Sequence, residues 1–203
     1  MRRDMLIGVV LVATLVVFSA RYAYAEEFFA RLDGFQEIGA LPTATAFPTG
    51  ALLSKGSGTL RLSLDSKAGT ARFTLTYSDV GTTAPKTGTV TQAHIHFGKR
   101  HVAGGVMVFF CATPPIVGPA GTPSPCPENS GTVTGTFTGD SVVGPAAQNV
   151  NPGDFNALVE ALRSNTAYAN IHTTAFPAGE IRGQIRRGLG HRDDHDNHDG
   201  DHK

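Results

Sequence analysis

Four of the eight histidines lie in the interior of the sequence, and their types and spacing suit a metal site. His94 and His96 alternate along 92–97, which reads as a β-strand, so both imidazoles share one face of it. His172 stands on a later predicted strand as the best third ligand, and His101 is a weaker fourth. Neutral imidazole binds ions such as Cu or Zn, so we expect a divalent transition metal here. The alternative is that these imidazoles only bond backbone carbonyls.

The remaining four histidines belong to the C-terminal segment 189–203, where they are interleaved with aspartates. From residue 191 onward this segment has no apolar residue to bury, so we expect it to be disordered. Such a tail can capture divalent metal weakly, because the chain can fold around an ion; alternatively it only keeps the protein in solution. The tail histidines are His191, His195, His198 and His202.

Two charged residues follow a predicted turn at 176–179. Glu180 and Arg182 fall on one face of the predicted strand 180–186, where they could position a ligand. The alternative is that they form an ion pair that fixes the strand geometry. Gly183, on the opposite face, indicates a bulge or a close approach of another backbone segment.

The only two cysteines, Cys111 and Cys126, flank a segment too rich in proline and glycine for a helix or a central strand. We expect a disulfide that closes this loop. In an oxidising compartment the closure would contribute about 3 kcal/mol by restricting the unfolded chain.

The elements that must position these residues are mostly short strands. Apolar residues alternate at Leu60, Leu62 and Leu64, and further strands are predicted near 28–32, 73–77, 90–97, 106–111, 132–138, 168–173 and 180–186. One helix is predicted from the apolar spacing at 155–162, with Asn151 as its cap. This pattern predicts an all-β fold, an antiparallel Greek-key β-sandwich or barrel of about eight strands with one short helix near the C-terminal end.

Residues 1–25 have the charged, apolar and small-residue parts of a signal peptide, ending at Ala25. Their removal takes three arginines and one aspartate from 17 basic and 17 acidic residues, which leaves 14 and 16. This near-neutral balance argues against nucleic acid as a partner. We expect a secreted or periplasmic protein without a stable membrane span after cleavage; the alternative is an uncleaved N-terminal anchor.

Several segments, in this order, resemble the CHRD (chordin-type) domain. They are 58–62, 73–78, the Ala93-His94-Ile95-His96-Phe97-Gly98 element, and Asn170-Ile171-His172-Thr173 followed by 177–184. The resemblance implies an extracytoplasmic β-domain over about 26–188, with no settled enzymatic activity. A looser similarity to Cu/Zn superoxide dismutase implies copper at His94, His96 and His172, with Arg182 attracting superoxide.

The sequence lacks common catalytic motifs such as G-x-S-x-G, Walker-type G-x-x-x-x-G-K and H-E-x-x-H, which favours a binding module over an enzyme. The leading hypothesis is an exported CHRD-domain module that binds a metal ion or an extracytoplasmic protein ligand. The alternatives are a copper-dependent, superoxide-dismutase-like oxidoreductase and a periplasmic scavenger that binds metal with its His/Asp tail.

Overall fold

The computed structural model describes residues 25–38, 50–114 and 123–188. The predicted signal peptide, except Ala25, and the predicted tail 189–203 lie outside these ranges. The strands are β1 Glu26–Asp33, β2 Ser57–Asp65, β3 Thr70–Ser78, β4 Val90–Phe97, β5 Gly105–Ala112, β6 Gly131–Phe137, β7 Ala167–Thr173, β8 Ile181–Gln184 and β9 Arg186–Arg187. The helices are the 3-10 turns η1 Gly34–Gln36, η2 Gly139–Ser141 and η3 Ala146–Gln148, and the α-helix α1 Phe155–Arg163.

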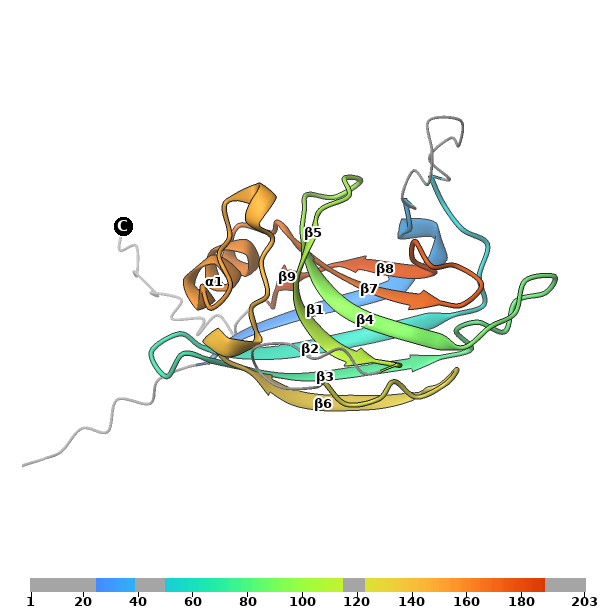
Figure 1. Ribbon diagram of the computed structural model, residues 1–203, viewed down its shortest axis with the longest axis horizontal. Coiled ribbons are helices and arrows are strands. Elements are labelled where there is room, and N and C mark those ends of the chain that lie inside the picture. Colours follow the sequence, from blue (N-terminus) through green and yellow to red (C-terminus); the bar gives the residue numbers. More distant parts are fainter. Residues whose placement is uncertain (1–24, 39–49, 115–122, 189–203) are drawn as a thin grey trace, which may run out of the picture.

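All strand pairs are antiparallel and form one sheet in the order β5-β4-β7-β8-β1-β2-β3-β6, with the short β9 also paired to β1. The two outermost strands, β5 and β6, contact each other, so the sheet curls into a nearly closed barrel (Figure 1). The neighbours β3 and β6, and β4 and β7, are joined by long connections, as in Greek-key folds. The predicted fold class is confirmed.

The alternating apolar residues account for the barrel interior. Leu60, Leu62 and Leu64 are each 1% exposed, and their partners on β3 are equally apolar. Phe73 packs against Phe110 of β5 and stacks on Phe137 of β6 at centroid distances of 4.9 and 4.5 Å. Burial of each such side chain stabilises the folded protein by about 1.5–3 kcal/mol. The apolar residues that predict the strands therefore also stabilise the barrel.

The helix α1 lies at one end of the barrel (Figure 1) and buries Leu158, Val159 and Leu162, as the apolar spacing predicts. Its cap differs from the prediction. The cap is Asp154, whose carboxylate accepts a hydrogen bond of 3.0 Å from the Ala157 amide, and Asn151 lies outside the helix. The reason is Gly153, whose φ of +89° is incompatible with a right-handed helix.

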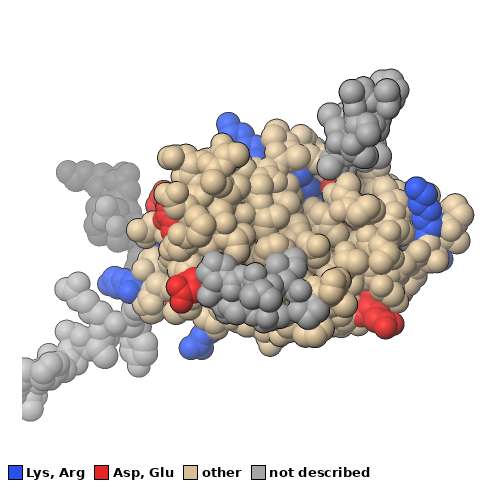
Figure 2. All heavy atoms as spheres, in the orientation of Figure 1, with Lys and Arg blue, Asp and Glu red and all other residues tan. Residues whose placement is uncertain are grey.

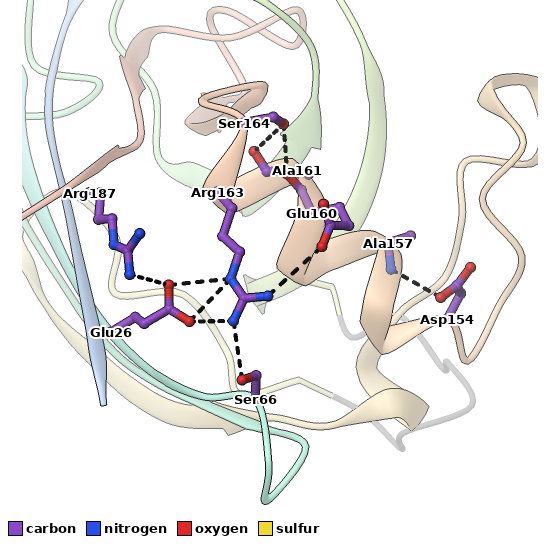
Figure 3. Close-up of polar contacts among 9 residues, drawn as sticks. All are labelled: Glu26, Ser66, Asp154, Ala157, Glu160, Ala161, Arg163, Ser164 and Arg187. Atoms are coloured by element: carbon purple, nitrogen blue, oxygen red, sulfur yellow. Dashed lines mark hydrogen bonds and ion pairs between the residues drawn. The ribbon is translucent and has the colours of Figure 1, made fainter. Parts of the chain in front are cut away.

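The first residue of β1 ties three parts of the chain together (Figure 3). Glu26 pairs with Arg163 at the end of α1 and, at 2.8 Å, with Arg187 of β9. Arg163 also donates a hydrogen bond to the Ser66 hydroxyl in the β2–β3 turn. The hydrogen bond from Arg163 lowers the pKa of Glu26, and the positive charges of Arg163 and Arg187 act in the same direction. The helix is thereby held against one end of the sheet.

Charged side chains do not gather on the face of the molecule shown in Figure 2, where they lie singly and mostly near its margin. Charge therefore marks no site on that face.

Cys111 of β5 and Cys126 form the predicted disulfide, with Cα atoms 5.0 Å apart and a sequence separation of 15. Replacing both cysteines by alanine should lower the free energy of unfolding by about 3 kcal/mol, because the unfolded chain regains the freedom of this loop. Urea unfolding of the two proteins measures the difference. Wild-type protein unfolded with a reducing agent should match the double variant; unchanged stability in both would contradict the prediction.

Candidate metal centre

The candidate site lies on the outward face of two neighbouring strands. On β4, Ala93 and Ile95 point into the core, so His94 and His96 point outward. On β7 the pairing sets His172 opposite Gln92, next to the histidine pair. The three imidazoles therefore meet on one face of the sheet.

The three rings are close together and mostly buried. The ring centroid of His94 lies 4.4 Å from that of His96 and 4.4 Å from that of His172. The centroids of His96 and His172 are 6.1 Å apart. One nitrogen from each ring lies within 4.8 Å of the others. His94 is 3% and His96 8% exposed, whereas His172 is partly exposed. Ligands about 2 Å from one ion lie roughly 3–4 Å apart, so an ion would draw these rings slightly inward.

Backbone carbonyls fix the orientation of two of the rings. The Nδ1 of His96 bonds the Gly104 carbonyl at 2.8 Å, and the Nδ1 of His172 bonds the Pro177 carbonyl at 2.9 Å. A carbonyl only accepts, so both Nδ1 atoms carry the proton and both Nε2 atoms present a lone pair. These two Nε2 atoms and Nδ1 of His94 are buried and have no hydrogen-bond partner among the described residues. Metal-binding histidines show the same arrangement, with the distal nitrogen held by a carbonyl.

The imidazoles are held in the neutral form that metal binding requires. Burial, reinforced by the neighbouring histidines, lowers the pKa of His94 well below its ordinary value. Burial lowers the pKa of His96 to about 4, against the raising effect of the Gly104 carbonyl. Burial also lowers the pKa of His172, although the Pro177 carbonyl and Glu37 act in the opposite direction. All three rings are therefore ready to bind a metal at neutral pH without losing a proton.

A second layer of side chains supports His96. The ring of Tyr168 stacks on it with centroids 4.7 Å apart, and the guanidinium of Arg182 lies 3.4 Å from the Tyr168 centroid. Arg182 donates hydrogen bonds to the carbonyls of Lys99 and Val102 at 3.1 and 3.0 Å. Tyr168 accepts one from the Gly104 amide at 3.1 Å. Both side chains thus fix the β4–β5 turn, whose Gly104 carbonyl orients His96.

Glu180 and Arg182 do not form the ion pair considered from the sequence, because each has other partners. Glu180 is fully buried and accepts hydrogen bonds from the Ser54 hydroxyl, the Gly81 amide and the Thr173 hydroxyl, all at 2.8 Å. Arg182 is 2% exposed and engaged with the β4–β5 turn, which disfavours the superoxide-attracting role implied by resemblance. Gly183 makes the close backbone approach predicted for it: an added Cβ would lie 2.2 Å from the Arg31 carbonyl.

The structure does not bring His101 to the other three histidines. It is exposed in the β4–β5 turn with a φ of +61°, so its proposed role as a fourth ligand is not supported by its position. The four tail histidines lie outside the described residues. Sequence reasoning missed Tyr168, although it occupies the same face of β7 as His172, four residues earlier.

The strand that carries the histidine pair is regular on one side only. Against β7, β4 keeps an unbroken register from Gln92 to Phe97. Against β5, its register shifts between Ala93 and His94 and again between Ile95 and His96. Such bulges alter local twist and are common beside functional sites.

The fold and the site define a class of protein: an antiparallel β-barrel with an imidazole cluster on adjoining strands. The chain belongs to the CHRD domain family, whose model matches residues 28–185. This match confirms the resemblance of the sequence motifs. No curated protein matches the chain. CHRD domains are typically extracellular. The described segments contain no helix with the length and apolar character that a membrane span requires.

Proposed function

We propose that the protein is an exported CHRD-domain binding module that holds one transition-metal ion, Cu or Zn, at His94, His96 and His172. In this proposal residues 1–25 are the signal peptide and 26–188 the binding domain. The observation that carries it is the convergence of three buried imidazoles, each with one buried nitrogen lacking a partner. Leaving such polar atoms unsatisfied costs free energy, and a shared ion would satisfy all three.

The chain's own residues supply both the ligands and their support. The Gly104 and Pro177 carbonyls hold the protons of His96 and His172 on Nδ1, away from the ion. Tyr168 and Arg182 hold the turn that carries the Gly104 carbonyl. When bound, a metal would add a positive centre able to take a further ligand, such as a side chain of an extracytoplasmic protein partner.

Metal analysis of the purified full-length protein tests this proposal. Wild type should hold about one ion per chain after dialysis, and His94→Gln and His172→Gln should lose it, because two imidazoles bind far more weakly than three. His101→Gln is the matched control and should retain the ion. Circular dichroism checks that each variant is folded. Folded His94→Gln and His172→Gln proteins with full metal content would contradict the proposal.

Deleting residues 191–203 separates the core site from the scavenging alternative. The core proposal expects the truncated protein to keep its ion. Loss of all metal with the tail, and none in the core variants, would instead assign metal binding to His191, His195, His198 and His202.

The oxidoreductase alternative is supported by one observation: the three imidazoles that come together are His94, His96 and His172, the residues to which the superoxide-dismutase similarity assigns copper. The copper-loaded protein can be assayed for superoxide consumption. A rate well above that of free copper, lost in His172→Gln, would replace the binding module with an enzyme.

A further inference from the structure

The outward face of β1, β2 and β3 is separate from the histidine cluster on β4 and β7, and it has an unusual composition. Most of its exposed or partly exposed positions are arginine, threonine or serine, and the exceptions are Glu27, Phe29, Asp33 and Asp65. The arginines, threonines and serines include Arg31 of β1, Ser57, Thr59, Arg61 and Ser63 of β2, and Arg72, Thr74, Thr76 and Ser78 of β3. Phe29, 45% exposed, lies between Glu27 and Arg31 on this face of β1.

The three arginines form a diagonal line across the three strands. Arg31 pairs with Thr59, two residues from Arg61, and Arg61 pairs with Thr74, two residues from Arg72. Diagonal neighbours in antiparallel sheets lie roughly 7–8 Å apart, so the line extends over about 15 Å. We call Arg31, Arg61 and Arg72 the arginine diagonal. The exposed Arg186 of β9 adds a fourth cation beside it, in register with Phe29.

The side chains of the arginine diagonal are exposed, and none has an ion pair or side-chain hydrogen bond within residues 25–38, 50–114 and 123–188. Glu27 lines the same hollow as Arg61 and Arg72 but forms no ion pair with either. Two other nearby carboxylates are engaged elsewhere. Asp33 accepts hydrogen bonds from Gln36, and Asp65 from the amides of its own turn. These guanidinium groups are therefore available to a ligand.

A surface hollow lies between two members of the diagonal. It has a volume of ≈ 140 Å³, and Arg61 and Arg72 line it together with Ser63, Thr74, Glu27 and the strand residues Leu62 and Phe73. Guanidinium groups bind sulfate, carboxylate or phosphate in a two-pronged manner, and neighbouring hydroxyls add hydrogen bonds. The hollow is therefore suited to one oxyanion, and the diagonal to a series of them.

We propose that the arginine diagonal and its surrounding hydroxyls bind a linear anionic polysaccharide. Regularly spaced cations fit a chain with repeating sulfate or carboxylate groups. Serine and threonine side chains match sugar hydroxyls, and the exposed ring of Phe29 offers an apolar surface to a sugar face. Glu27 at the hollow adds an acceptor for a sugar hydroxyl. This site is independent of the proposed metal centre.

Binding of defined glycans to the full-length protein tests the inference. A heparin octasaccharide supplies sulfates, polygalacturonate supplies carboxylates, and dextran is the uncharged comparison; calorimetry or interferometry measures affinity. At least one anionic glycan should bind, more weakly as salt rises, and dextran should not. Which of the two binds identifies the oxyanion. The double variant Arg61→Ala/Arg72→Ala should weaken binding by about 10-fold or more, since two charge-assisted contacts are lost.

The matched control is Lys99→Ala/Arg100→Ala, which removes the same charge from exposed residues of the β4–β5 turn and should leave affinity within about two-fold. Equal weakening in both double variants would overturn the proposal, because it would mean that only net charge matters. So would the absence of binding to either anionic glycan, or tighter binding to phosphatidylglycerol vesicles. Binding should persist in His172→Gln treated with EDTA; dependence on metal would also overturn it.

Discussion

Replacing Glu180 by leucine should lower the free energy of unfolding by about 3–5 kcal/mol, the largest effect we expect from a single substitution. The carboxyl group is fully buried and accepts hydrogen bonds from Ser54, Gly81 and Thr173. These donors come from three segments far apart in sequence. Leucine would leave them without an acceptor in the protein interior, where each unmade bond is costly. Urea unfolding followed by circular dichroism measures the loss.

Two further variants make this result interpretable. Glu180→Gln keeps the shape and one acceptor oxygen, so its stability should fall between wild type and Glu180→Leu. Glu128→Gln removes the same charge from an exposed residue and should change stability by less than about 0.5 kcal/mol. A Glu180→Leu protein as stable as wild type would refute the structural role.

Acidification should destabilise the metal-free protein strongly between pH 6.5 and pH 4. An unfolded histidine titrates near 6.5, whereas burial lowers the pKa of His96 in the folded protein to about 4. Between these values the unfolded chain binds more protons, so the free energy of unfolding falls as pH falls. His96 alone accounts for about 3 kcal/mol by pH 4. The lowered pKa values of His94 and His172 act in the same direction.

Unfolding in urea with EDTA at several pH values between 7.5 and 4.5 measures this dependence. Above pH 7 the slope that these histidines contribute should become small, because the unfolded histidines are then mostly neutral as well. His96→Gln should flatten the profile below pH 6.5, and the exposed His101→Gln should not. Equal slopes in wild type and His96→Gln would show that other groups cause the acid lability.

The fold was predictable because its strands carry local signals. Alternating apolar residues, as at Leu60, Leu62 and Leu64, fix which face is buried, and glycine- and proline-rich turns separate the strands. The predicted strand 180–186 is the main difference, because it is split into β8 and β9 around Ile185. β8 pairs with β7, where Gln184 is opposite Tyr168, whereas β9 pairs with β1, where Arg186 is opposite Phe29.

The site was predictable only in part. Alternation on β4 fixes the shared face of His94 and His96, which is a local feature. Local patterning also places His172 on a strand, but its position beside the pair depends on the long-range pairing of β4 with β7. The roles of Arg182 and Gly104 depend on how the β4–β5 turn folds back over β8, which no local pattern encodes. His101 lies outside the cluster for the same reason: proximity in sequence to His96 does not determine where the turn places a residue.

The two register shifts between β4 and β5 have a consequence for which strand pair holds the imidazoles in place. Both fall on the β5 side of the histidine pair, while the β7 side keeps His94, His96 and His172 in continuous register. The relative positions of the three imidazoles are therefore set by the pairing of β4 with β7 and not by that of β4 with β5. β5 itself is constrained by the core, where Met107, Val108 and Phe110 are buried. A one-residue slip between β4 and β7 would turn His94 and His96 into the core.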